Sequence, residues 1–258
     1  MQSLKRISVY AFVLLLPILL HGHFQVVLPS TDIVEGSDSR EIIVDLFFCH
    51  PFEGDLMNMT KPQGFGVCIQ GGKKEDLLES LTEKKVNGLS RWQTIYQIKK
   101  PGDHVFYTEP KPYWESAEGK FIIHYTKVVV DAFGLELGWD VEVGMETEIL
   151  PLTRPYGLYT GNLFRGVVLV HGKPAPFANI EVEYYNENRE YQAPASSFIT
   201  QVIKTDINGV FSYAMPFAGW WGFAALSESD EEIMNPDDGK YYPVELGALI
   251  WVRTANIK

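Results

Sequence analysis

The sequence predicts an all-β fold with two sandwich-like domains. Apolar runs rich in Val, Ile, Phe, Tyr and Trp recur along the chain, and clusters of Gly, Pro, Asp and Asn separate them. Several of these runs are almost continuously apolar, as expected for strands buried between two sheets. In the first part of the chain the predicted strands are 41–48, 65–69, 91–99 and 120–130.

One stretch favours a helix instead. Between residues 74 and 85, Leu77, Leu78 and Leu81 recur at helical spacing. We therefore expect a single short helix in an otherwise β protein. A Pro-rich segment at 150–157 then divides the chain. It predicts an N-terminal β-sandwich-like domain at 23–155, followed by a smaller C-terminal β-sandwich at 156–258.

The second part carries the signals of a small Greek-key-like sandwich. Strands are predicted at 164–170, 178–185 and 210–214, with a turn at 205–209. The segments "GVVLVHGKPAPFANIEVEYYN" and "TDINGVFSYAMP" resemble transthyretin-like or carboxypeptidase-regulatory-like (Ig-like) modules. Such modules are usually structural, so the resemblance implies a supporting role for this half.

The N-terminus has the layout of a secretory signal peptide at 1–22. Lys5 and Arg6 precede an apolar run at 9–20, and the small residue Gly22 follows it. The apolar run is shorter than the roughly 20 residues that span a bilayer as a helix. We therefore expect an exported, periplasmic or extracytoplasmic protein.

The cleavage point decides the first residue of the exported chain. Signal peptidase prefers a small residue before the cut, and a cut after Gly22 makes His23 residue one. His23 would then offer an α-amine and an imidazole, a chelating pair that suits nickel, cobalt and copper. A cut after Leu20 would instead leave His21, Gly22 and His23 at the terminus, which is also a strong copper or nickel chelator. Both cuts produce a metal-binding terminus.

Charge and motifs narrow the function classes. The chain has 22 Lys and Arg against 33 Asp and Glu, a formal net charge of −11, and residues 1–22 contain no acid. This balance disfavours nucleic acid as a partner and favours cations. The sequence contains no Walker loop, GxSxG elbow or HExxH helix, so we do not expect an enzyme. Cys49 and Cys68 allow at most one disulfide, and their pairing stays open.

The histidines are the candidate metal ligands. His124 lies inside a predicted strand and shares a face with Thr126 and Val128, so its imidazole points among apolar neighbours. Both ring nitrogens then need partners, which either a metal or hydrogen bonds within the core would supply. His50 stands at a strand exit, where a solvated strand end is the alternative. His104 follows Asp103 and is expected to be exposed.

Four segments carry a family resemblance: "HGHFQVVLPS", "CHPFEGDLMNM", "HVFYTEPKPYWESAEGKFIIHYTKVVVDAFGLELGWD" and "TEILPLTRPYGLYTGNLFRGVVLVHGKPAPFANIEVEYYN". They look like the NikK/CbiK-type extracytoplasmic nickel or cobalt uptake proteins. The resemblance covers nearly all of the exported part and is most specific between residues 104 and 140.

The resemblance implies what the chain binds and which residues bind it. It implies two β-domains that capture Ni²⁺ or Co²⁺ as a transported ligand and deliver it to an energy-coupling-factor or other ABC-type membrane transporter. The metal ligands that it implies are His23, His124, His104 and His50. Glu109 and Glu115, beside an aromatic segment, either neutralise a ligating histidine or are solvated.

Two other classes of function stay open. One is a copper enzyme of the histidine-brace type, in which His23 and a second histidine hold the copper. The other is a secreted β-sandwich interaction module that binds no metal. Replacement of His23 by alanine separates the last class from the other two, because an interaction module would keep its ligand.

Overall fold

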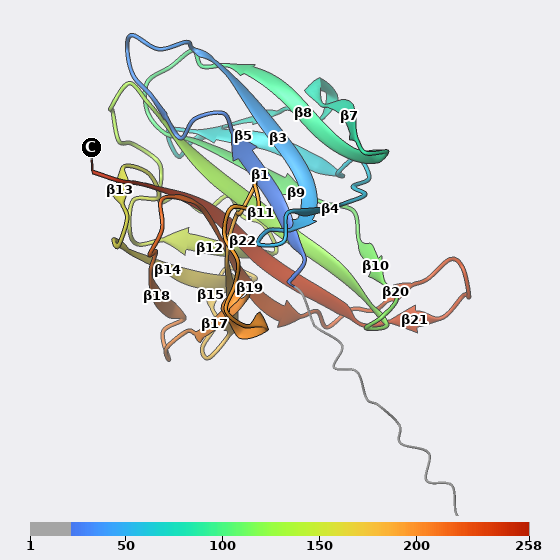
Figure 1. Ribbon diagram of the computed structural model, residues 1–258. Coiled ribbons are helices and arrows are strands. Elements are labelled where there is room, and N and C mark those ends of the chain that lie inside the picture. The colour runs from blue at the N-terminus through green and yellow to red at the C-terminus, as the bar shows by residue number, and fades with distance from the viewer. Residues whose placement is uncertain (1–21, 258) are drawn as a thin grey trace, which may run out of the picture.

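The computed structural model describes residues 22–257, which form an all-β protein as predicted (Figure 1). Within these residues the helical segments are two 3-10 turns, η1 (Leu78–Ser80) and η2 (Ser196–Phe198). In this part of the chain no helix is long and apolar enough to cross a membrane. The predicted signal peptide, except Gly22, lies outside the described residues.

A five-stranded sheet holds the start of the described chain. Its order is β1-β3-β8-β7, with β4 on the free end of β3. All of its pairs are antiparallel. The bounds are β1 (Phe24–Pro29), β3 (Glu41–His50), β4 (Asp55–Met57), β7 (Thr82–Val86) and β8 (Leu89–Gln97).

A long second sheet runs through the whole described molecule in the order β17-β16-β19-β22-β11-β9-β5-β6. Short strands β2, β10 and β13 pair at its margins. The bounds are β2 (Ile33–Val34), β5 (Gly64–Ile69), β6 (Lys73–Asp76), β9 (His104–Glu109), β10 (Tyr113–Glu115), β11 (Lys120–Ala132), β13 (Leu158–Tyr159), β16 (Asn179–Tyr184), β17 (Gln201–Lys204), β19 (Gly219–Glu228) and β22 (Val244–Ala255).

Two smaller sheets complete the described fold. The first joins β14 to β12, β15 and β18, and the second is the β20–β21 hairpin. The bounds are β12 (Thr147–Pro151), β14 (Leu163–Val170), β15 (Lys173–Pro174), β18 (Val210–Ala214), β20 (Ile233–Met234) and β21 (Tyr241–Tyr242).

The long sheet forms one layer of two sandwiches. On one side β9 and β11 pack against the five-stranded sheet over a core that includes Phe24 and Phe106. On the other, β16, β19 and β22 pack against the sheet of β12, β14 and β18 over a core that includes Phe164 and Phe223. These strands are buried between sheets, which explains why their sequences read as continuous apolar runs.

The last strand joins the two halves of the chain. β22 lies beside β11 in a parallel pair that runs from Phe121 opposite Val244 to Val128 opposite Trp251 (Figure 1). The predicted boundary at 155/156 falls in the link between β12 and β13. The long sheet continues across that boundary, so the two halves share one layer.

The predicted helix at 74–85 is wrong. This stretch forms the end of β6, the turn η1 and most of β7. β6 pairs with β5 and β7 pairs with β8, so both ends find strand partners. A 12-residue helix is marginal in water without tertiary packing, and edge pairing replaces it here.

A buried ion pair holds β12 against β11. The Lys127 side chain is fully buried, and its ammonium contacts the carboxylate of Glu148. Glu148 also accepts hydrogen bonds from the backbone N–H groups of Val143 at 2.8 Å and Gly144 at 2.9 Å. Removal of one member would leave an uncompensated buried charge.

We therefore expect Lys127→Met to lower the free energy of unfolding by about 3–5 kcal/mol. Urea denaturation of the purified protein measures the change. The matched control is Lys73→Met, which breaks the exposed pair of Lys73 with Glu75 and should cost less than about 1 kcal/mol. Equal losses in the two variants would contradict the role assigned to the buried pair.

Candidate functional site

The pairing of β1 with β3 brings two predicted ligands together. Phe24 pairs with Cys49 in this antiparallel register, so one step further out His23 lies opposite His50. The ring centroids of the two histidines are 4.7 Å apart. β3 ends at this point because Pro51 follows, and proline has no backbone N–H to continue the ladder.

His124 approaches the same place from the opposite sheet. It lies on β11 and points toward β3, with its ring centroid 6.0 Å from that of Phe48. Thr126 and Val128 share this face, since Thr126 contacts the carbonyl of Gln25 on β1 and Val128 belongs to the core between the sheets. The orientation predicted for His124 is therefore confirmed.

The His124 imidazole is buried without a hydrogen-bond partner. Its side chain is 3% exposed, and neither ring nitrogen makes a hydrogen bond to the described residues. The neighbouring strand makes room for the ring with a glycine, because a Cβ at Gly247 would lie 2.3 Å from its Cδ2 atom. A buried imidazole with two unsatisfied nitrogens is a costly arrangement that a ligand would relieve.

Burial and nearby ionisable groups determine the pKa of His23. Its Nε2 atom lies 3.2 Å from Oε2 of Glu115 on β10. Burial and the nearby His50 lower the pKa of His23 to about 4, although Glu115 opposes them. The imidazole is therefore neutral at physiological pH, the state in which it can ligate a metal. Of the two acids that the sequence suggested beside the histidines, Glu115 is the one in contact.

Further acidic side chains, which the sequence analysis missed, border His124. His124 Nε2 lies 3.9 Å from Oε1 of Glu245 on β22, and Lys120 Nζ lies 2.6 Å from the other oxygen of that carboxylate. Burial by itself raises the pKa of Glu245, but His124 and Lys120 together lower it to about 2. Glu118 and Glu181 line the same small cavity, of about 70 Å³, between His23 and His124.

Gly22 lies against two carboxylates of β16. A Cβ at this position would be 2.9 Å from Oε2 of Glu181 and 2.9 Å from Oε1 of Glu183. Burial raises the pKa of Glu181 to about 7 and that of Glu183 to about 8. The carbonyl oxygen of Gly22 is also 3.2 Å from Nδ1 of His50. The residue before the predicted cleavage point therefore fills the space between the histidines and these acids.

The structure does not bring His104 to the other three histidines. His104 pairs with Val130 on β11, six residues beyond His124, which is about 20 Å along the strand at ~3.4 Å per residue. Its side chain is fully buried, so the expected exposure is wrong, and its Nδ1 atom is 2.9 Å from the carbonyl oxygen of Gly102. His104 therefore lies in the core, apart from this cluster.

The cysteines do not join the cluster either. Cys49 and Cys68 are both buried free thiols. Alternation along β3 turns Cys49 to the face opposite His50, and burial raises its pKa well above the usual range. Among residues 22–257, no group of three or more His, Cys, Asp or Glu side chains is arranged to hold a metal ion. His23, His50 and His124 are gathered, but in this arrangement their nitrogens do not converge on one point.

The signal for Glu245 was absent from the local sequence. Glu245 lies on the last strand, β22, and only the parallel pairing of β22 with β11 places this residue beside His124. Glu181 and Glu183 have a local signal, since they alternate on one face of a predicted strand. That pattern is also typical of a solvated strand face, so it did not point to a site.

Comparison with known families matches residues 20–229 to a domain of unknown function, DUF4198. The chain belongs to the DUF4198 family. The match begins just before His23 and includes His50, His124 and Glu181, but it ends before Glu245. A search of curated proteins found no relative of this DUF4198 protein.

Solved structures share only weak similarity with this DUF4198 protein. Latent PorU from Porphyromonas gingivalis is 13% identical with a TM-score of 0.25, and the match covers 90% of this chain and 20% of PorU. The Yersinia pseudotuberculosis adhesin InvE is 10% identical with a TM-score of 0.23, covering 87% of this chain and 58% of InvE. The chain thus spans about a fifth of the first and over half of the second. Scores this low carry no argument about function.

We expect Gly247→Ala to displace the His124 ring, because the new methyl group would overlap its Cδ2 atom. The free energy of unfolding should fall by about 1–3 kcal/mol, and the imidazole NMR signals of His124 should shift. The matched control is Gly36→Ala, where an added Cβ meets nothing within 4 Å. Unchanged His124 signals in the Gly247 variant would contradict the close packing of the two residues.

Stability should depend on pH through Glu183. The pKa of Glu183 is about 8 in the folded protein, against an ordinary value of 4.5. The stability that the protonated carboxyl contributes to the folded protein is therefore complete below about pH 4.5, and it is lost as the pH rises through 8. In a chain that retains Gly22, we expect the urea midpoint to fall between pH 5 and pH 8. Glu183→Gln should flatten this fall, because the amide does not ionise. An identical pH profile in the variant would count against the assignment.

Proposed function

We propose that this protein is an exported carrier that captures Ni²⁺ or Co²⁺ and delivers it to a membrane transporter. The observation that carries the proposal is the gathering of His23, His50 and His124 at the predicted cleavage point. Three imidazoles suit borderline divalent ions such as nickel and cobalt better than calcium or magnesium. The resemblance to NikK/CbiK-type uptake proteins supports the same function.

The exported terminus would complete the donor set. A cut between Gly22 and His23 removes the carbonyl beside His50 Nδ1 and creates an α-amine next to the His23 imidazole. Amine and imidazole of one residue form a chelate ring with nickel or cobalt. The acids Glu115 and Glu245 lie next to His23 and His124, where a carboxylate orients a ligating imidazole and raises its basicity.

A carrier must also release its cargo. The predicted terminal residue is held by side-chain contacts and precedes the first strand, so it can move away without unfolding a sheet. The other ligands, His50 and His124, are fixed by β3 and β11. We infer that the membrane partner takes the ion as the terminus swings out, and that the protein performs no reaction on it.

Calorimetry on protein processed by its own signal peptidase tests this function. At pH 7 we expect one Ni²⁺ or Co²⁺ to bind, with release of about one proton from the terminal amine, whose ordinary pKa is about 7.7–8.0. The His23 imidazole should release none, because its pKa of about 4 leaves it neutral. Titration in two buffers of different ionisation enthalpy counts the proton, and mass spectrometry confirms the terminus.

Three variants make the result specific. His124→Ala should abolish tight binding, and an alanine added before His23 should weaken it at least tenfold and remove the proton release. His171→Asn is the matched control, since His171 is exposed in a turn with φ 49°, a conformation that asparagine tolerates. Absence of binding at one equivalent would favour an interaction module. Preference for copper with oxidant-dependent turnover would favour the histidine-brace enzyme.

A further inference from the structure

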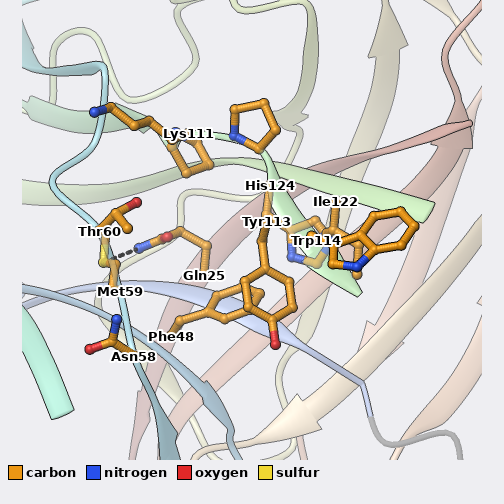
Figure 2. A pocket seen from close by; sticks show the side chains of 12 residues that line it. Gln25, Phe48, Asn58, Met59, Thr60, Lys111, Tyr113, Trp114, Ile122 and His124 are labelled. Carbon is orange, nitrogen blue, oxygen red and sulfur yellow. Dashed lines mark hydrogen bonds between the residues drawn. The ribbon is translucent and has the colours of Figure 1, made fainter. Parts of the chain in front are cut away.

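A second cavity, of about 330 Å³, lies beside the histidine cluster and shares His124 with it (Figure 2). This size falls at the small end of the range of about 300–1,000 Å³ found for small-molecule sites. The cavity opens between β10, β11 and the segment that follows β4. The ion capture proposed above does not use it.

Aromatic rings form one wall of this cavity. The ring of Tyr113 lies 5.2 Å from that of Phe48, and Ile122 continues the same wall (Figure 2). The Trp114 ring turns to the other face of β10, where its centroid lies 5.0 Å from that of Phe121. Tyr113 and Phe48 also contact the His23 ring, with centroids 6.1 and 6.0 Å from it. Flat aromatic walls favour a flat, apolar ligand body, which packs on them by offset or edge contacts.

Polar groups stand at two places around this apolar space. On the inside is His124, buried and without a hydrogen-bond partner among the described residues. At the rim is Lys111, an exposed cation for which the described part of the chain provides no ion pair. Gln25 is not available in the same way, because its amide donates to Met59 Sδ and to the Phe47 carbonyl.

We propose that this cavity takes a small, flat aromatic carboxylate that also coordinates the captured ion. Its ring would pack against Tyr113 and Phe48, its charge would face Lys111, and its donor atoms would reach the ion beside His124. The inference rests on the proposed ion capture, since the acid and the protein share one ion. The cargo is then a metal complex rather than a bare ion, with the coordination positions that three histidines leave open filled by the acid.

Equilibrium dialysis with pyridine-2-carboxylate (picolinate) and Ni²⁺ tests the proposal on processed protein. We expect one picolinate to be retained per bound Ni²⁺. Thr60→Trp should reduce this retention at least tenfold while bare Ni²⁺ still binds, because Thr60 lines the cavity and an indole there would fill it. The matched control is Thr82→Trp, an exposed threonine on β7 away from the cavity, which should retain picolinate normally.

The charge at the rim has its own test. Lys111→Gln should weaken retention of picolinate about fivefold but leave its neutral amide, pyridine-2-carboxamide, unaffected. An equal effect on both compounds would overturn the role of Lys111 and with it the choice of a carboxylate.

The outcomes separate this inference from the proposed function. Ni²⁺ bound without picolinate in the unmodified protein overturns the inference and leaves ion capture standing. Absence of Ni²⁺ binding overturns both. Full retention of picolinate by a His23→Ala variant that binds no Ni²⁺ would show a site independent of the ion, which also overturns the shared coordination.

Discussion

The parallel pairing of β22 with β11 is the constraint on which the rest of the structure depends. It inserts the end of the chain into the middle of the long sheet and makes that sheet a common layer for both sandwiches. The same register sets Gly247 beside His124 and brings Glu245 within 3.9 Å of its ring. A slip of one residue would turn Glu245 to the other face of the sheet and put a side chain where the imidazole lies.

The pattern of apolar runs was enough to predict β3, β5, β8, β11, β14, β16 and β18 and the orientation of His124. Both depend on short-range alternation, which the chain displays directly. The leucines near 77–81 led to the wrong prediction of a helix for a related reason. Their spacing fits a helix, but β5 and β8 offer backbone pairing to either side, and this is invisible without knowing which strands are neighbours.

The composition of the candidate site was only partly predictable. His23 and His50 meet through a register that the sequence does not reveal, yet the predicted cleavage point marked His23 and the end of a predicted strand marked His50. His104 looked equivalent by residue type, but the antiparallel pairing of β9 with β11 carries it to the far end of the sheet. Glu245 is 121 positions from His124 and is brought to it only by long-range strand pairing, so no local sequence pattern indicates this contact.

The site combines neutral and charged groups in an ordered way. Burial keeps His23 uncharged, and His124 and Lys120 together lower the pKa of Glu245 and keep it charged. Farther back, Glu181 and Glu183 sit in a setting that favours their protonated forms. A positive charge that entered this region would meet the charged carboxylate of Glu245, and Glu181 and Glu183 could ionise in response.

The position of Gly22 has a consequence for when the protein can work. While the predicted leader is attached, a peptide bond stands where the terminal amine would be, and the Gly22 carbonyl lies against His50. Under the proposed function a newly made chain in the cytoplasm lacks this donor and binds the ion more weakly than the exported protein does. Cleavage during export would irreversibly create the metal-binding terminus. Tight metal binding would then be confined to the exported protein without any separate regulator.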